Sequence, residues 1–122
     1  MTNILNLLPS IISGAENPLS TISKAVGITG TFKTGANLDV DTSADVLTAT
    51  DFDTTQGVMI TADVDNSGIV YIGNSDVDAV ATDATSGLPL SAGESLFFSC
   101  SNPNLVYCIA SAVNQKLYWL AV

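Results

Sequence analysis

The sequence predicts an all-β protein: a single antiparallel β-sandwich or jelly-roll-like domain preceded by a short N-terminal helical or extended arm. Two observations carry this prediction. From Thr31 onward, Thr and Val are abundant, short apolar runs alternate with clusters of Gly, Asn, Ser and Asp, and no long helical period appears. The length, 122 residues, suits one domain. We therefore divide the chain into an arm or docking segment, 1–30, and a β-sandwich domain, 31–122.

The segment 1–30 has a different pattern from the rest of the chain. Its apolar residues recur with the period of one helix face, although Pro9 lies inside the pattern and must occupy a first turn or end the helix. Three interpretations stay open: docking on its own domain, an arm that reaches a neighbouring subunit, or removal by cleavage. The residues expected to contact a partner are Ile4, Leu5, Leu8, Ile11 and Ile12.

The strongest turn signal in the domain is Asp65-Asn66-Ser67-Gly68. It separates the apolar runs 58–64 and 69–72, and these residue types favour a hairpin turn. The hairpin would set Val64 opposite Ile69. Its two faces would be Val58, Ile60, Ala62, Val64, Ile69 and Tyr71 on one side, and Met59, Thr61, Asp63, Val70 and Ile72 on the other.

The rest of the domain continues the strand-and-turn pattern. We expect a polar loop with a short strand over 74–86, a turn over 87–93, and then a strand over 94–100. After a further turn at 101–104, the last apolar runs are expected to form a closing hairpin across Asn114-Gln115. Its two strands would be 105–113 and 116–122.

The closing hairpin would be apolar on both sides. It would place Trp119 opposite Ala110, a large residue against a small one, as packing prefers. A strand that is apolar on both sides is buried on both sides, so we expect one side to be core and the other a subunit interface. The expected core side is Cys108, Ala110, Ala112, Leu117, Trp119 and Ala121. The other side is Leu105, Tyr107, Ile109, Val113, Tyr118, Leu120 and Val122, from which we select Tyr107, Tyr118, Leu120 and Val122 as partner-interface residues.

The composition argues against most catalytic chemistry. The chain has no His or Arg, and three Lys stand against twelve Asp and Glu. It therefore lacks the imidazole of His, which titrates near neutral pH, and the guanidinium of Arg, whose N–H groups bind phosphate. The formal net charge of −9 opposes nucleic-acid binding. We expect no enzyme activity, no cofactor and no nucleic-acid partner, although two Asp that meet in space, as in glycosidases, stay open from sequence.

The balance of apolar and charged residues predicts association. Hydrophobic residues make up 47% and charged residues only 12%, against about 25% charged in an average soluble chain. No apolar run approaches the roughly 18 residues of a membrane span. The start has no cationic region of the kind a signal peptide needs, so we expect synthesis in a cytoplasm. The surplus apolar surface predicts a homo-oligomer.

The segment Asp63-x-Asp65-x-Ser67-Gly68 opens like an acidic calcium loop. The twelfth position of such a loop holds a bidentate Glu, and here it is Asn74. A hairpin turn explains the same residue types. A weak surface Ca²⁺ site that also uses Asp76, Asp78 and Asp83 is conceivable, but we assign no metal site.

The two cysteines, Cys100 and Cys108, are expected to be free thiols. Pairing of Cys100 with Leu105 across the 101–104 turn would pair Cys108 with Phe97, and the two thiols would then point to opposite faces. No His or nearby cation is present to lower the pKa of either thiol.

Residues 57–122, about half of the chain, resemble a pattern found in small virion proteins of tailed bacteriophages. The motifs that carry the resemblance are Val70-Tyr71-Ile72-Gly73-Asn74-Ser75, then Gly87-Leu88-Pro89-Leu90 with Gly93-Glu94, and Tyr107-Cys108-Ile109-Ala110. The resemblance implies a β-sandwich subunit of a capsid decoration (cement) protein in the virion, or of a tail or head-fibre component. Decoration proteins of this kind are often trimers that reinforce the shell. The implied partners are the major capsid protein or another virion protein, and further copies of the chain.

A second function class stays open from the sequence. The chain would be a tail or head-fibre adaptor that recognises a host-surface glycan through Trp119, the tyrosines and polar loops. Such a site needs an exposed aromatic platform. The expected position of Trp119 opposite Ala110 instead predicts a core residue.

Overall fold

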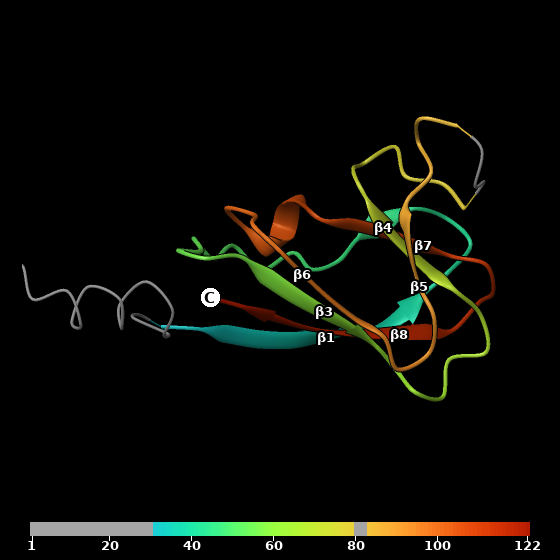
Figure 1. Ribbon diagram of the computed structural model, residues 1–122, viewed down its shortest axis with the longest axis horizontal. Helices are drawn as coiled ribbons and strands as arrows, with labels where there is room; N and C mark the ends of the chain where they lie inside the picture. The colour runs from blue at the N-terminus through green and yellow to red at the C-terminus, as the bar shows by residue number, and fades with distance from the viewer. Residues whose placement is uncertain (1–30, 80–82) are drawn as a thin grey trace, which may run out of the picture. The chain divides into compact units, whose positions relative to one another are not determined.

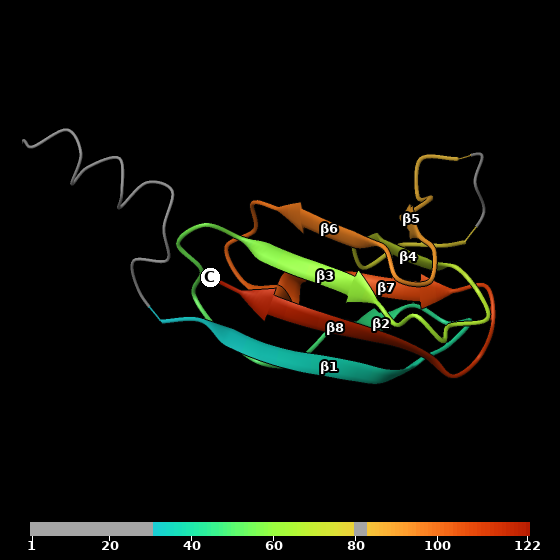
Figure 2. The same ribbon diagram turned by 60° about the horizontal axis from the view of Figure 1, so that its bottom comes forward.

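The computed structural model describes residues 31–79 and 83–122 (Figures 1 and 2). The described part forms one compact unit, Phe32–Val122. The predicted arm residues, Ile4, Leu5, Leu8, Ile11 and Ile12, lie outside the described residues, so their contact with a partner stays a prediction.

In the described residues eight strands form two four-stranded antiparallel sheets, which confirms the predicted all-β sandwich. The first sheet has the order β1-β8-β3-β6, which can be followed in Figure 2, and the second has the order β2-β7-β4-β5. No α-helix occurs among the described residues, only the short 3₁₀ helix η1 (Pro103–Leu105). The strands are β1 (Lys33–Val40), β2 (Asp45–Val46), β3 (Val58–Ala62), β4 (Val70–Gly73), β5 (Leu88–Leu90), β6 (Ser95–Phe98), β7 (Tyr107–Ala110) and β8 (Gln115–Ala121).

The strand pairing is nested. β1 pairs with β8, β2 with β7, β3 with β6 and β4 with β5, so the first half of the domain pairs with the second half. Additional pairing of β3 with β8 and of β4 with β7 completes each sheet. Consecutive strands other than β4 and β5 therefore lie in opposite sheets. This is the strand order of an eight-stranded jelly roll.

The predicted hairpin around Asp65–Gly68 is wrong. β3 lies in the first sheet and β4 in the second, so the turn is a crossover and Val64 has no strand partner in Ile69. β3 and β4 consequently face one core from opposite sides, and the expected face is right for β3 but reversed for β4. The buried residues are Val58, Ile60 and Ala62 of β3 and Val70 and Ile72 of β4, whereas Tyr71 points outward.

The predicted closing hairpin is also wrong. β7 belongs to the second sheet and β8 to the first, so Trp119 pairs with Gly35 and Ile60 and not with Ala110. The expected core side nevertheless holds, because both strands face the same core from different sheets. Its buried members are Cys108, Ala110, Leu117, Trp119 and Ala121.

The buried side chain of Gln115 joins the two crossovers that imitate hairpins. Its Oε1 accepts a hydrogen bond from the Gly68 N–H at 2.8 Å. Its Nε2 donates to the Ser67 hydroxyl at 3.2 Å and to the Val113 carbonyl at 2.7 Å. The turn at 65–68 and the turn at 111–114 are therefore held together across the end of the sandwich. The sequence pattern predicts two independent hairpins at these turns.

The core between the sheets is apolar, and one glycine sets how β1 joins it. Gly35 pairs with Trp119, and a Cβ at Gly35 would lie 2.6 Å from the indole ring. Only glycine lets β1 pass beneath the indole at this distance. The core consists of Val40, Leu47, Val58, Ile60, Ala62, Val70, Ile72, Leu90, Val106, Cys108, Ala110, Leu117, Trp119 and Ala121.

The outer face of the second sheet is partly covered by the connection from β4 to β5. Val77 is buried there, and a Cβ on Gly73 or Gly87 would come within 2.7 Å or 2.6 Å of its Cγ2 atom. The connection is held on itself by the Thr85 hydroxyl, which donates to the Asp78 carboxylate at 2.7 Å. Among the described residues no helix has the length and apolar character needed to cross a membrane.

Candidate interaction surfaces

The four domain residues predicted to contact a partner do not form one surface. Tyr118 and Leu120 lie on the outer face of the first sheet, whereas Tyr107 lies on the outer face of the second. Val122 is only 7% exposed, and its carbonyl accepts hydrogen bonds from the N–H groups of residues 55–57. The expectation that these residues share one face is therefore wrong, and Val122 is buried, whereas contact of Tyr107, Tyr118 and Leu120 with a partner stays a prediction.

An apolar row crosses the outer face of the first sheet. The register places Thr34, Leu120, Met59 and Phe97 side by side on β1, β8, β3 and β6. Met59 and Phe97 are exposed and Leu120 is half-buried. A shallow hollow of about 430 Å³ lies over part of the same face, lined by residues that include Met59, Tyr118 and Leu120. We call Thr34, Leu120, Met59 and Phe97 the outer row.

Beside the outer row, Tyr118 is hydrogen-bonded to Asp63. The Tyr118 hydroxyl donates to the Asp63 Oδ2 at 2.6 Å. This bond, followed by the bond from the Asp65 N–H, lowers the pKa of Asp63. The same bond raises the pKa of Tyr118. The register sets Thr61 and Ser95 beside Tyr118, so a polar row lies next to the outer row on the same face.

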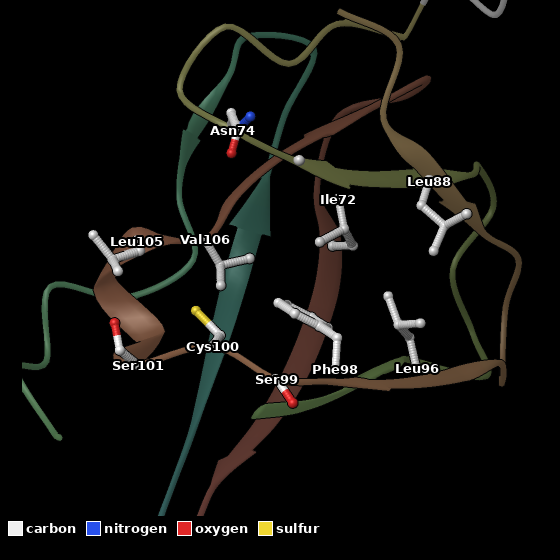
Figure 3. A pocket seen from close by; sticks show the side chains of 11 residues that line it. Ile72, Asn74, Leu88, Leu96, Phe98, Ser99, Cys100, Ser101, Leu105 and Val106 are labelled. Atoms are coloured by element: carbon white, nitrogen blue, oxygen red, sulfur yellow. The ribbon is translucent and has the colours of Figure 1, made fainter. Parts of the chain in front are cut away.

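A groove opens between the two sheets at the β5/β6 edge (Figure 3). It encloses about 520 Å³, and no charged side chain lines it. Figure 3 shows Ile72 and Leu88 of the second sheet above Leu96 and Phe98 of the first. We call this cavity the edge groove. Its lining is Ile72, Gly73, Asn74, Leu88, Leu96, Phe98, Ser99, Cys100, Ser101, Leu105 and Val106.

The edge groove exists because the strands that border it are short. β5 has three residues with Pro89 in the middle, and β6 has four. Leu96 and Phe98 face the core, yet both stay half-buried because the opposite sheet does not extend over them. The sequence analysis missed this site. The run Leu96-Phe97-Phe98 carried the signal, since a strand that is apolar on both faces needs cover on both faces.

The opposite edge of the sandwich is closed. The Asn37 amide of β1 donates to the Val46 carbonyl of β2 at 3.3 Å and contacts the Cys108 Sγ at 4.0 Å. Cys108 is fully buried, and burial, with a smaller contribution from Asp45, raises its pKa to about 12. A thiol of this kind stays protonated and unreactive at neutral pH.

Both cysteines are free, and the register predicted for them is wrong. Cys108 pairs with Ile72 and Asp45, and Phe97 pairs with Met59. Cys100 is half-buried on the wall of the edge groove, where its Sγ donates to the Asn102 carbonyl at 3.2 Å. The two thiols therefore lie in different parts of the domain.

The acidic turn that resembles a calcium loop is used for structure. The Asp63 Oδ1 accepts the Asp65 N–H at 2.8 Å. The Asn66 amide pairs with the backbone of Lys116 in both directions, at 2.9 Å and 2.8 Å. These bonds account for the residue types in the turn. No group of three or more His, Cys, Asp or Glu with a metal-binding arrangement occurs within 31–79 and 83–122.

Trp119 does not offer a surface for a sugar ring. Its side chain is 4% exposed, and the buried Nε1 has no hydrogen-bond partner among the described residues. The exposed aromatic side chains in the described part of the chain are Phe32, Phe97 and Tyr118. They lie on or next to β1, β6 and β8.

Comparison of the chain with protein-family models, with curated proteins and with solved structures finds no match. The described residues offer two apolar surfaces: the outer row on the face of the first sheet, and the edge groove at the β5/β6 edge.

Proposed function

We propose that this chain is a non-enzymatic virion structural protein, of the capsid decoration (cement) type, which stabilises a shell through subunit contacts. One observation carries the proposal: the domain leaves much of its apolar side-chain surface uncovered. Seven large apolar side chains of the described residues are more than half exposed. They are Phe32, Leu38, Val64, Leu88, Phe97, Leu105 and Val113.

The fold and the sequence resemblance supply the viral context. Eight-stranded jelly rolls are common among viral capsid proteins and also among lectins. This is an argument by analogy of fold, and a fold alone does not fix a function. The motifs within 57–122 favour the capsid side of that analogy.

The proposed mechanism is the burial of apolar area. Stable protein interfaces bury about 1,600 Å² in total, and repetition over many equivalent sites of a shell adds avidity. The partners would be the major capsid protein or another virion protein and further copies of the chain. The net charge of −9 leaves nucleic acid an unsuitable partner.

The test is binding to virus particles that lack this protein. Purified full-length chain should co-sediment with the particles, and a chain without residues 1–13 should stay folded but remain in the supernatant. A matched pair refines the result: Ile4, Leu5 and Leu8 replaced by Ser should abolish binding, whereas Thr2, Asn3 and Asn6 replaced by Ser should not. Equal binding of the truncated and full-length chains would refute the role of the arm. Failure of the full-length chain to bind would refute the capsid function.

The alternative, an adaptor that recognises a host-surface glycan, loses its main aromatic candidate. With Trp119 buried, we expect acrylamide to quench its fluorescence weakly, and added oligosaccharides to leave the emission unchanged. Strong quenching by acrylamide would return Trp119 to the surface and favour the glycan-binding function.

A further inference from the structure

The four outer strands of the two sheets differ in how well they are protected against pairing with another chain. β1 carries Lys33 and Asp39 and has an irregular register between Asn37 and Val40. β2 has only two residues, and β5 contains Pro89. Charges, bulges, shortness and proline are the usual devices that block an edge. β6 is also short, with four residues, but it has no proline, charge or register shift.

The backbone of β6 has one unpaired side. The Ala62 N–H donates to the Glu94 carbonyl at 2.9 Å, which fixes the phase of the β3–β6 ladder. In an antiparallel pair the residues alternate in direction, so Leu96 and Phe98 turn their N–H and C=O groups toward β3. The same groups of Ser95 and Phe97 point away from the sheet. Within the described part of the chain no strand lies on that side.

The side chains of β6 also lack cover on both faces. Leu96 and Phe98 face the core but border the edge groove and stay half-buried. Phe97 points to the outer face, ends the outer row, and is 53% exposed. An added strand beside β6 would cover all three side chains and satisfy the free backbone groups.

The charge pattern of β6 indicates which strand fits there. Antiparallel pairing of two β6 strands about Phe97 sets Phe97 opposite Phe97 of the second copy and Ser95 opposite its Ser99. Glu94 then lies opposite Cys100 of the second copy, far from the other Glu94. A parallel pair would instead bring the two Glu94 carboxylates together, which is unfavourable. Residues 95–100 carry no charged side chain, so two copies of β6 can pair about Phe97 without charge repulsion.

We propose that a second copy of this chain docks at the β6 edge, so that two β6 strands pair antiparallel about Phe97 and form a two-fold dimer. The two first sheets then become one eight-stranded sheet. The outer row continues across the two-fold axis through Phe97 and Met59 of both copies, and Leu96 of each copy lies beside Phe98 of the other at the mouth of the edge groove. This contact is one of the subunit contacts on which the proposed function depends, but the geometry of β6 stands without it.

The test is the mass of the full chain by light scattering over a range of concentrations. We expect twice the 12.6 kDa of one chain. Phe97→Pro removes the outward N–H without touching the β3 ladder, a position where edge proline is tolerated. Phe97→Lys places a charge on the edge. Each should weaken the dimer at least about tenfold in Kd. Phe97→Lys serves as the second variant if Phe97→Pro does not fold.

Met59→Lys is the matched control. It puts the same charge on the same outer face, but on β3, which has a strand on each side. It should leave most of the dimer intact. Loss of the dimer in Met59→Lys equal to that in Phe97→Lys would overturn the edge pairing in favour of face-to-face contact. A wild-type monomer, a wild-type trimer, or Phe97 variants that stay dimeric would also overturn it.

Amide hydrogen exchange gives a readout specific to the pairing. In the dimer the N–H groups of Ser95 and Phe97 should exchange slowly, and on dilution to monomer they should exchange fast, while the Leu96 N–H stays slow in both. Fast exchange of the Phe97 N–H in the dimer would refute the proposed register. Particle binding is measured on the same samples. A β6 dimer that does not bind virus particles would refute the capsid function only. A trimer or monomer that binds virus particles would refute the edge pairing only.

Discussion

The two long edges of the jelly roll differ: the β1/β2 edge is closed and the β5/β6 edge is open. At the β1/β2 edge, the Asn37 side chain spans the sheets, and the inner residues nearby, such as Val40 and Cys108, are fully buried. At the β5/β6 edge no side chain spans the sheets within the described residues, and a groove of about 520 Å³ remains. Apolar residues that face the core are therefore fully buried at the β1/β2 edge and only partly buried at the β5/β6 edge.

This difference shows that a small domain can fold with a core that is incompletely covered at one edge. A closed edge stabilises the isolated chain, whereas an open apolar edge keeps stabilisation in reserve for association. Because β6, one of the two strands at the open edge, has no charge, proline or bulge, the two properties indicate the same site for a partner.

The largest effect is expected from truncating the same residue type on the two sides. Leu47, which directly follows β2, is fully buried, and Leu47→Ala should lower the free energy of unfolding by about 2–5 kcal/mol. Leu96→Ala on β6 should lower it by less than about 2 kcal/mol, because part of that side chain is already exposed to water. Urea unfolding at low protein concentration measures both. Equal losses would remove the contrast between the edges.

The buried thiol of Cys108 gives a test in alkaline solution. Burial raises the pKa of Cys108 from its ordinary value near 9.0 to about 12, so the folded thiol stays neutral while the unfolded thiol ionises. This contribution to stability is complete below pH 9 and is lost as the pH rises from about 9 to about 12. At pH 10 the loss should be roughly 1.4 kcal/mol.

The measurement is the free energy of unfolding of the wild type and of Cys108→Ala between pH 7 and pH 10. Each protein is referenced to its own value at pH 7, which removes the effect of the cavity. Cys108→Ala should lose less stability on alkalinisation than the wild type. Parallel curves for the two proteins would show that Cys108 ionises freely in the folded state.

A smaller effect is expected from the side chain that closes the first edge. Asn37→Ala removes the hydrogen bond to the Val46 carbonyl and should destabilise by about 1 kcal/mol. The matched control is Asn74→Ala, at the rim of the edge groove, where the side chain is exposed and the change should be near zero. Thermal unfolding of the two variants decides this. A larger loss for Asn74→Ala would mean that the open edge carries the more important polar contact.

The smallest effect concerns β8, which lies inside the first sheet between the two edges. Tyr118→Phe removes the hydrogen bond to Asp63, so the lowered pKa of that carboxyl should rise toward its ordinary value of 3.8. Because the pKa is lowered in the folded protein, the bond contributes stability above pH 3.8 and loses it as the pH falls through the folded value. Carboxyl titration by NMR should show the shift. An unchanged Asp63 titration would exclude Tyr118 as its cause.

The sequence predicted the fold class and most inward-facing residues, and it failed on connectivity. Period-two alternation is a local property, so the inward positions of β3, β7 and β8 were predicted correctly. Whether a turn joins neighbours in one sheet or crosses to the other depends on residues far away, such as Gln115 holding Gly68. Asp65–Gly68 suits both outcomes, and the hairpin was therefore the wrong choice.

The candidate surfaces were predicted less completely. Tyr118 and Leu120 do face outward on the first sheet, but Val122 is buried because its carbonyl receives the backbone of residues 55–57. The edge groove was not predicted at all. It follows from the unequal lengths of strands in opposite sheets, and the lengths of β5 and β6 become meaningful only once their partners are known.

The nested pairing has a consequence for how the chain reaches its native state. β8 lies in the first sheet between β1 and β3, so β1 has no neighbour until β8 has been synthesised. The sheet therefore cannot grow from its first strands as the chain leaves the ribosome. Contacts between residues so distant in sequence slow folding to milliseconds or seconds. We expect a lag between the end of translation and the appearance of assembly-competent subunits. During this lag the apolar β6 strand is exposed to solvent.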